Sequence, residues 1–95
     1  MNTITKQVVF IAKEDSIEEL KALLKMMVTP SKAEDGCLFY EISQLKDKRD
    51  EFLVVESWRD EKALDGHKAS SHYADYKSKF EPFCKEKYSY ELEVL

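Results

Sequence analysis

The fold of this chain is decided by the segment FLVVESWRDEKALDGHKASSH, residues 52 to 72. Residues 52–58 are rich in β-branched and aromatic side chains and therefore predict a strand. Two sets of side chains would alternate along it, with Phe52, Val54, Glu56 and Trp58 on one face and Leu53, Val55 and Ser57 on the other. Both faces are largely apolar, so both should be covered, and the pattern leaves open which face meets the helices.

A helix is predicted directly after this strand. Asp60 is the predicted N-cap of a helix that carries Ala63, Leu64 and His67 at helical spacing. The segment KASSH predicts an interruption, because Ser70 or Ser71 can cap a second helical segment. Aromatic residues of that segment would seal it against the sheet, and a proline closes it: Tyr73, Tyr76, Phe80, Phe83 and Pro82.

Three more strands are predicted from the rest of the chain. Residues 4–13 and 37–45 have strand-forming composition, and the short polar turn that follows residue 45 makes the second and third strands antiparallel. Residues 87–95 alternate apolar and polar side chains. They predict a last strand with one strongly apolar face, made of Tyr88, Tyr90, Leu92 and Val94.

A helix is predicted between the first two strands. Ser16 and Glu19 have the spacing of a capping box, and an apolar stripe follows them at helical spacing. Pro30 disfavours helical geometry in the residue before it, so this helix should break or kink near residue 29, with residues 31–34 adding a turn.

The order strand, helix, strand, strand, helix, strand is the split βαβ plan, which predicts an α+β chain with a ferredoxin-like βαββαβ fold and an antiparallel sheet. One domain would span residues 1–95. Helices on one side cannot cover a sheet that is apolar on both faces. A second sheet from another copy of the chain would cover the open face, so a homodimer is predicted.

The composition argues against several classes of function. Acidic residues outnumber basic ones by 19 to 15 and the two kinds are interleaved, so binding to nucleic acid is not expected. The chain has no run of about 18 apolar residues and no leader-like pattern in MNTITKQVVF, which predicts a cytoplasmic protein that does not enter a membrane. Cys37 and Cys84 lack a CxxC companion and are interpreted as buried free thiols, with a redox role for Cys84 as the alternative.

The segments EDGCLFYEI, residues 34–42, and FLVVESWRDEKALDGHKASSH resemble the antibiotic biosynthesis monooxygenase family, the small dimeric α+β barrel proteins that include quinol monooxygenases. The matching motifs are acid-x-Gly-Cys-x-x-Tyr-Glu, the E-x-W strand end and the A-L-x-x-H-x-x-S-x-H helix. The resemblance extends over nearly the whole chain and implies the fold that the order of elements predicts independently.

The resemblance also implies a reaction. Family members of the monooxygenase kind use no metal, flavin or haem, because a phenol or hydroquinone substrate supplies the electrons for dioxygen. Such a protein provides a dry pocket, a proton acceptor and donors to the substrate oxygen. His67 is the candidate acceptor, since an imidazole exchanges protons near neutral pH. Candidates for contact with an aromatic substrate are Trp58, Phe52, Glu56, His72 and Tyr76.

Structural roles are the alternatives for the same residues. His67 can bond a carbonyl at a helix end, Trp58 can belong to the core, and Glu56 can form a hydrogen bond or ion pair inside an apolar strand. His72 is expected to be partly exposed, and on one continuous helix it would point away from His67. The cysteines and histidines present no convincing ligand set, so no metal is predicted.

Other branches of the family imply other functions. Haem-degrading relatives have an Asn on the first strand, a Trp on the second helix and an iron-binding His about ten residues later. Here no Asn follows Asn2 on that strand, His67 is near the place of the Trp, and Lys77, which has no lone pair when protonated, is near that of the His. Two alternatives stay open: an isomerase or other proton-transfer enzyme acting on a small oxygenated metabolite, and a non-catalytic dimeric module that binds a small molecule.

Overall fold

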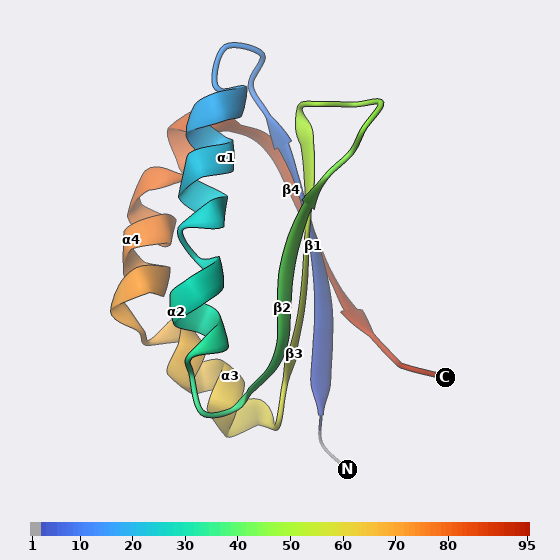
Figure 1. Cartoon of the computed structure of the whole chain (residues 1–95), viewed down its shortest axis with the longest axis vertical. Coiled ribbons are helices and arrows are strands. Elements are labelled where there is room, and N and C mark those ends of the chain that lie inside the picture. The colour runs from blue at the N-terminus through green and yellow to red at the C-terminus, as the bar shows by residue number, and fades with distance from the viewer. Residues whose placement is uncertain (1–2) are drawn as a thin grey trace.

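A computed structural model describes residues 3–95 as a four-stranded antiparallel sheet with helices on one side (Figure 1). The strand order is β2-β3-β1-β4, which is the split βαβ arrangement. The predicted α+β, ferredoxin-like fold is therefore confirmed. The elements in chain order are β1 (Ile4–Ala12), α1 (Ile17–Lys25), α2 (Val28–Lys32), β2 (Cys37–Gln44), β3 (Glu51–Trp58), α3 (Glu61–Lys68), α4 (Ser71–Lys79), the 3-10 turn η1 (Glu81–Phe83) and β4 (Cys84–Leu92).

The face of β3 that carries Glu56 and Trp58 is the face that meets the helices. Its four residues are buried, whereas Leu53, Val55 and Ser57 on the other face are half-buried. In Figure 1 all the helices lie on one side of the sheet, and the C-terminal tail points away from them on the other side. The sequence left this choice open because both sets of side chains are largely apolar.

The first helix breaks earlier than predicted. Helix α1 ends at Lys25 and α2 begins at Val28, so the break lies before residue 29. Pro30 belongs to the first turn of α2, where a backbone N–H would have no partner within the helix. The proline therefore helps to begin a short second helix. The extra turn predicted for residues 31–34 lies at Val28–Lys32.

Two of the three predicted helix caps are present. Asp60 accepts a hydrogen bond from the backbone N–H of Ala63 at 2.8 Å, and Ser70 accepts one from that of Tyr73 at 3.3 Å. Ser16 does precede α1, but its hydroxyl makes no cap bond and donates instead to Asp15. The predicted capping box is therefore wrong, because the backbone at Ser16 is not in the extended conformation that aims a cap side chain at the helix (φ −127°, ψ 17°).

Strand β4 begins at Cys84, three residues before the predicted start. The residues just before Tyr88 are polar and do not alternate with apolar ones, so the sequence gives no sign of a strand there. They nevertheless pair with β1, as far as a bulge at Ile11/Ala12. The predicted apolar face is present in Tyr88, Tyr90 and Leu92, while Val94 lies beyond the strand.

Both cysteines are free, as predicted, but they are half-buried rather than buried. Burial raises the pKa of each thiol, which keeps it protonated and weakens the case for a redox role for Cys84. No helix within residues 3–95 is long and apolar enough to cross a membrane.

Candidate active site

A cavity of about 60 Å³ lies between the sheet and helices α3 and α4. Its closed end is formed by buried side chains, among them Tyr40, Glu56, His67 and Tyr76. Its open end is lined by Lys6, Lys68, Lys87 and Ser89, which are exposed or half-buried. The cavity is smaller than the apolar cavity of about 150 Å³ that is known to hold benzene, so an aromatic ring could enter it only in part and would extend into the open mouth.

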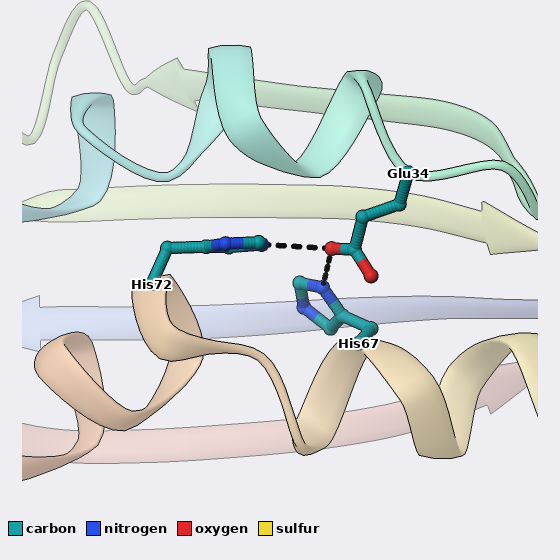
Figure 2. Close-up of side chains that lie close together, drawn as sticks. All are labelled: Glu34, His67 and His72. Atoms are coloured by element: carbon teal, nitrogen blue, oxygen red, sulfur yellow. Dashed lines mark hydrogen bonds and ion pairs between the residues drawn. The ribbon is translucent and has the colours of Figure 1, made fainter.

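A carboxylate joins the two histidines behind this cavity (Figure 2). The Oε2 atom of Glu34 lies 2.7 Å from Nδ1 of His67 and 2.7 Å from Nε2 of His72. An ionised carboxylate can only accept, so both nitrogens donate to it. Neutral His67 then carries its proton on Nδ1 and its lone pair on Nε2. His67 is 2% exposed and lines the cavity, so its ring is a buried proton acceptor.

Ser70 fixes the break between α3 and α4 that brings the histidines together. Its hydroxyl donates to the backbone carbonyl of His67 at 2.6 Å, and its oxygen lies 3.2 Å from His72 Nε2, where it can share as a second, weaker acceptor the proton that this nitrogen donates to Glu34. The expectation that His72 points away from His67 is wrong. That geometry applies to one continuous helix, whereas the capped break at Ser70 starts α4 in a new direction and turns His72 toward Glu34.

The loop that carries Glu34 is held against α3 by a close approach at Gly36. A Cβ atom at this position would lie 2.2 Å from the Cβ of Ala63, and the carbonyl of Gly36 accepts a hydrogen bond from the backbone N–H of Arg59 at 2.8 Å. The backbone of Gly36 is not left-handed. Space, not conformation, therefore requires glycine here, and the close contact places Glu34 within reach of both imidazoles.

Glu56 and Trp58 form a second buried pair. The indole N–H of Trp58 donates to Oε1 of Glu56 at 2.7 Å. The Trp58 ring also packs on the His67 ring, with centroids 4.4 Å apart and an interplanar angle of 32°. Glu56 thus has the hydrogen bond that a carboxylate needs in this strand, and it lines the cavity as well.

Three tyrosines complete the wall around His67. Burial raises the pKa of Tyr40, Tyr76 and Tyr73, and the charge of Glu56 raises it further. Their phenol groups therefore remain protonated at neutral pH and can donate hydrogen bonds to an oxygen atom in the cavity.

Only half of the site residues proposed from the sequence line the cavity. His67, Glu56 and Tyr76 line the cavity, Phe52 and Trp58 lie in the core behind it, and His72 supports Glu34. The sequence missed Glu34, although that residue opens the EDGCLFYEI motif. It also missed the rim lysines, whose convergence depends on three separate elements.

Glu34, His67 and His72 are also the one set within residues 3–95 whose donor atoms lie close enough to share a metal ion, within 4.8 Å of one another. A metal would need the nitrogen lone pairs at positions that now carry the protons donated to Glu34. Two atoms that each bind one tetrahedral metal at about 2.0–2.2 Å lie about 3.3–3.6 Å from each other. The nitrogen–oxygen distances of 2.7 Å are shorter than this and are those of hydrogen bonds. The absence of a bound metal stays a prediction, which elemental analysis of the purified protein can check.

Comparison with known proteins places this arrangement in a family. The model of the antibiotic biosynthesis monooxygenase family matches residues 3–79, and the chain belongs to that family. The chain is similar to the Mycobacterium tuberculosis protein named "Putative monooxygenase Rv0793", with 39% identity over 69 residues, which cover 73% of this chain and 67% of that protein.

Solved structures of similar proteins have the same fold as this chain. Rv0793 superposes with a TM-score of 0.92 at 30% identity, over 99% of this chain and 96% of that one. PA3566 from Pseudomonas aeruginosa gives a TM-score of 0.95 at 28% identity, over 100% and 96%. Family membership and the relatives' names support a monooxygenase-like function.

Proposed function

We propose that this protein is a cofactor-independent monooxygenase that oxidises a phenolic or hydroquinone-like aromatic molecule with dioxygen. The observation that carries the proposal is the buried imidazole of His67, which lines the cavity while Glu34 holds its Nδ1 proton. The Nε2 lone pair is left to accept the hydroxyl proton of a substrate. The carboxylate orients the ring and stabilises the imidazolium that forms.

The proposed reaction balances without a cofactor. For a hydroquinone, the substrate supplies all four electrons that reduce dioxygen, one oxygen atom forms a bond to a ring carbon, and the other leaves as water. His67 takes the first proton, which makes the ring electron-rich enough to pass an electron to dioxygen, and returns it to the departing oxygen. The neutral hydroxyls of Tyr40, Tyr73 and Tyr76 can stabilise the charge on the substrate oxygen.

A second candidate, proton transfer within a small oxygenated metabolite, is favoured by one observation. Glu56 and His67 line the same cavity, and a carboxylate with an imidazole can remove a proton at one atom and deliver it to another. Oxygen uptake with a panel of hydroquinones tests the monooxygenase. Exchange of substrate protons with deuterated water, without oxygen uptake, would instead support an isomerase. Binding of these compounds without either reaction would support a non-catalytic module that binds a small molecule.

We further propose that the protein acts as a homodimer in the cytoplasm. Support for the dimer is the apolar side chains on the uncovered face of the sheet, where Phe39, Tyr88, Tyr90 and Leu92 are each at least 39% exposed. Packing two such faces together would bury them and complete the barrel that the family resemblance implies. The cytoplasmic location rests on sequence composition alone.

A further inference from the structure

Three lysines converge on the open end of the cavity. They come from separate elements: Lys6 from β1, Lys68 from the end of α3 and Lys87 from β4. None of them forms an ion pair within 4.0 Å with another residue of the described range 3–95. The chain as a whole carries a net charge of −4. The cluster of cations at the mouth of this cavity therefore has the opposite sign to the net charge of the chain.

Lys87 lies directly against the aromatic wall. Its Nζ is 4.9 Å from the ring centroid of Phe80, 5.4 Å from that of Tyr76 and 5.5 Å from that of Phe10. Burial, and then the charges of Lys77 and Lys6, lower the pKa of Lys87. An anion bound between these ammonium groups would offset their repulsion, so the cluster gains more from a negative ligand than scattered surface lysines would.

Two acidic groups lie near His67. Glu56 lines the cavity and Glu34 lies behind His67, so a negative group would be repelled from the part of the cavity next to this imidazole. Glu56 and Glu91 are also the cross-strand partners of Lys6 on β3 and β4 and partly offset its charge, which leaves Lys68 and Lys87 as the main cationic groups of the rim. The polarity along the cavity thus favours one orientation: a neutral hydroxyl toward His67 and an anionic group toward Lys68 and Lys87.

We propose that the substrate is an aromatic acid, bound with its carboxylate at Lys6, Lys68 and Lys87 and its phenolic hydroxyl at His67. This inference deepens the proposed function, because it names the class of substrate for the same cavity. Charge-assisted hydrogen bonds from lysine to a carboxylate are stronger than those between neutral groups, so the lysines would select the acid over its neutral analogue.

Trp58 allows a test by binding alone. It is the single tryptophan of the chain, and it contacts both Glu56 and His67, so its fluorescence reports on the cavity. The probes are 4-hydroxybenzoate and its neutral analogue 4-hydroxybenzamide. We expect the acid to bind about 10-fold more tightly or better. Lys87→Gln and Lys6→Gln should each remove much of this preference, whereas Lys25→Gln, an exposed change on α1 that lowers the net charge equally, should preserve it.

Equal affinity for the two probes would overturn the inference, as would a preference that survives in both rim variants while circular dichroism shows them to be folded. Oxygen uptake separates this result from the fate of the monooxygenase proposal. If the protein binds the acid selectively but consumes no oxygen with any carboxylated hydroquinone, the proposed ligand class is kept and the monooxygenase activity is rejected. If it consumes oxygen equally fast with and without a carboxylate on the hydroquinone, the monooxygenase activity is kept and the ligand class is rejected.

Discussion

The two faces of the sheet are made from alternate residues of the same strands, yet they differ in how completely the chain covers them. On β3, the residues that meet the helices are at most 8% exposed, whereas Leu53, Val55 and Ser57 are only half-buried. On β4, the outward side chains Tyr88 and Tyr90 are 42% and 51% exposed. The covered face holds a packed core and a cavity, while the open face holds apolar area that the chain itself leaves uncovered.

The candidate active site and the proposed dimer contact therefore lie on opposite faces of the sheet. The groups proposed for chemistry lie on the covered side, where exclusion of water strengthens their electrostatic interactions. The open face also carries polar side chains: Gln7 lies between Val55 and Tyr90, and Glu41 lies beside Val55. Two of its hydroxyls satisfy each other, because Thr5 Oγ1 and Ser57 Oγ are 2.9 Å apart across β1 and β3. Burying that face against a second copy would therefore leave this pair of hydroxyls bonded.

The largest expected effect is on assembly. Val9→Lys places a charge near the centre of the open face, beside Leu53 and Tyr88 on the neighbouring strands, and in a symmetric dimer this charge would occur twice. An unpaired buried charge costs several kcal/mol, so dimer affinity should fall by about 100-fold or more. Light scattering should give twice the chain mass of 11.1 kDa for the unaltered protein and the single mass for Val9→Lys.

Ala22→Lys is the control for this experiment, because residue 22 is exposed on α1, on the opposite side of the molecule from the open face. It should leave the dimer intact. A soluble, stable monomer in the unaltered protein would remove the case for face-to-face packing altogether.

The next effect concerns the covered face. His67→Gln keeps a donor for Glu34 but removes the imidazole nitrogen proposed to accept the substrate proton, so turnover should fall by about 10²-fold or more, the usual scale for general acid–base catalysis. His67→Phe is less informative, because it would also leave Glu34 without one of its two donors. The measurement is oxygen uptake with whichever hydroquinone proves active.

His72→Gln is the matched control. It alters the other donor to the same carboxylate oxygen, but residue 72 does not line the cavity, so only a small loss of turnover is expected. Equal losses in the two variants would mean that both histidines act only by supporting Glu34. Near-normal turnover in both would reduce His67 to a structural residue.

A third effect concerns the contact that positions Glu34. Gly36→Ala would place a methyl group 2.2 Å from the Cβ of Ala63, where neither atom can rotate away. Overpacking of this kind costs about 1–3 kcal/mol. Gly66→Ala makes the same change within α3, where nothing lies within 4 Å, and should stabilise the helix by about 0.5–1 kcal/mol. Thermal unfolding of the two variants should therefore shift in opposite directions, and a Gly36→Ala variant as stable as the unaltered protein would contradict this account of Gly36.

Much of the covered face could be predicted because local patterns determine it. The alternation of β3, the cap at Asp60 and the break at Ser70 all follow from residues close in the sequence. The capping box predicted at Ser16 was wrong, and the helix break predicted near residue 29 lies at residues 26–27. Serine and proline are each compatible with two local geometries, and packing chooses between them. The choice between the two faces of β3 could not be made, since it depends on which apolar set the helices contact.

The site was harder to predict than the fold, for a related reason. His67 stands out because a titrating residue lies beside an apolar stripe, but its partner Glu34 is 33 positions away in a loop. Tyr40 and Glu56 are neighbours only through the register of β2 and β3. The direction of His72 was predicted wrongly because the two-residue break at Ala69 and Ser70 changes the direction of the side chains that follow it. Such convergence requires tertiary structure, which the sequence alone does not provide.

The smallest expected effect is a pH dependence that belongs to the covered face. Burial raises the pKa of Tyr76 above its ordinary value, with Tyr73 and Tyr40 contributing further, so the folded state holds this proton to higher pH than the unfolded chain does. The stabilisation is complete below the ordinary tyrosine value of about 10 and is lost as the pH rises above it. Tyr76→Phe removes this titration, so between pH 10 and 11 the variant should lose about 1 kcal/mol less stability than the unaltered protein. Urea unfolding at one fixed protein concentration measures the difference, and parallel pH profiles for the two proteins would show that the phenol of Tyr76 ionises equally well in the folded state.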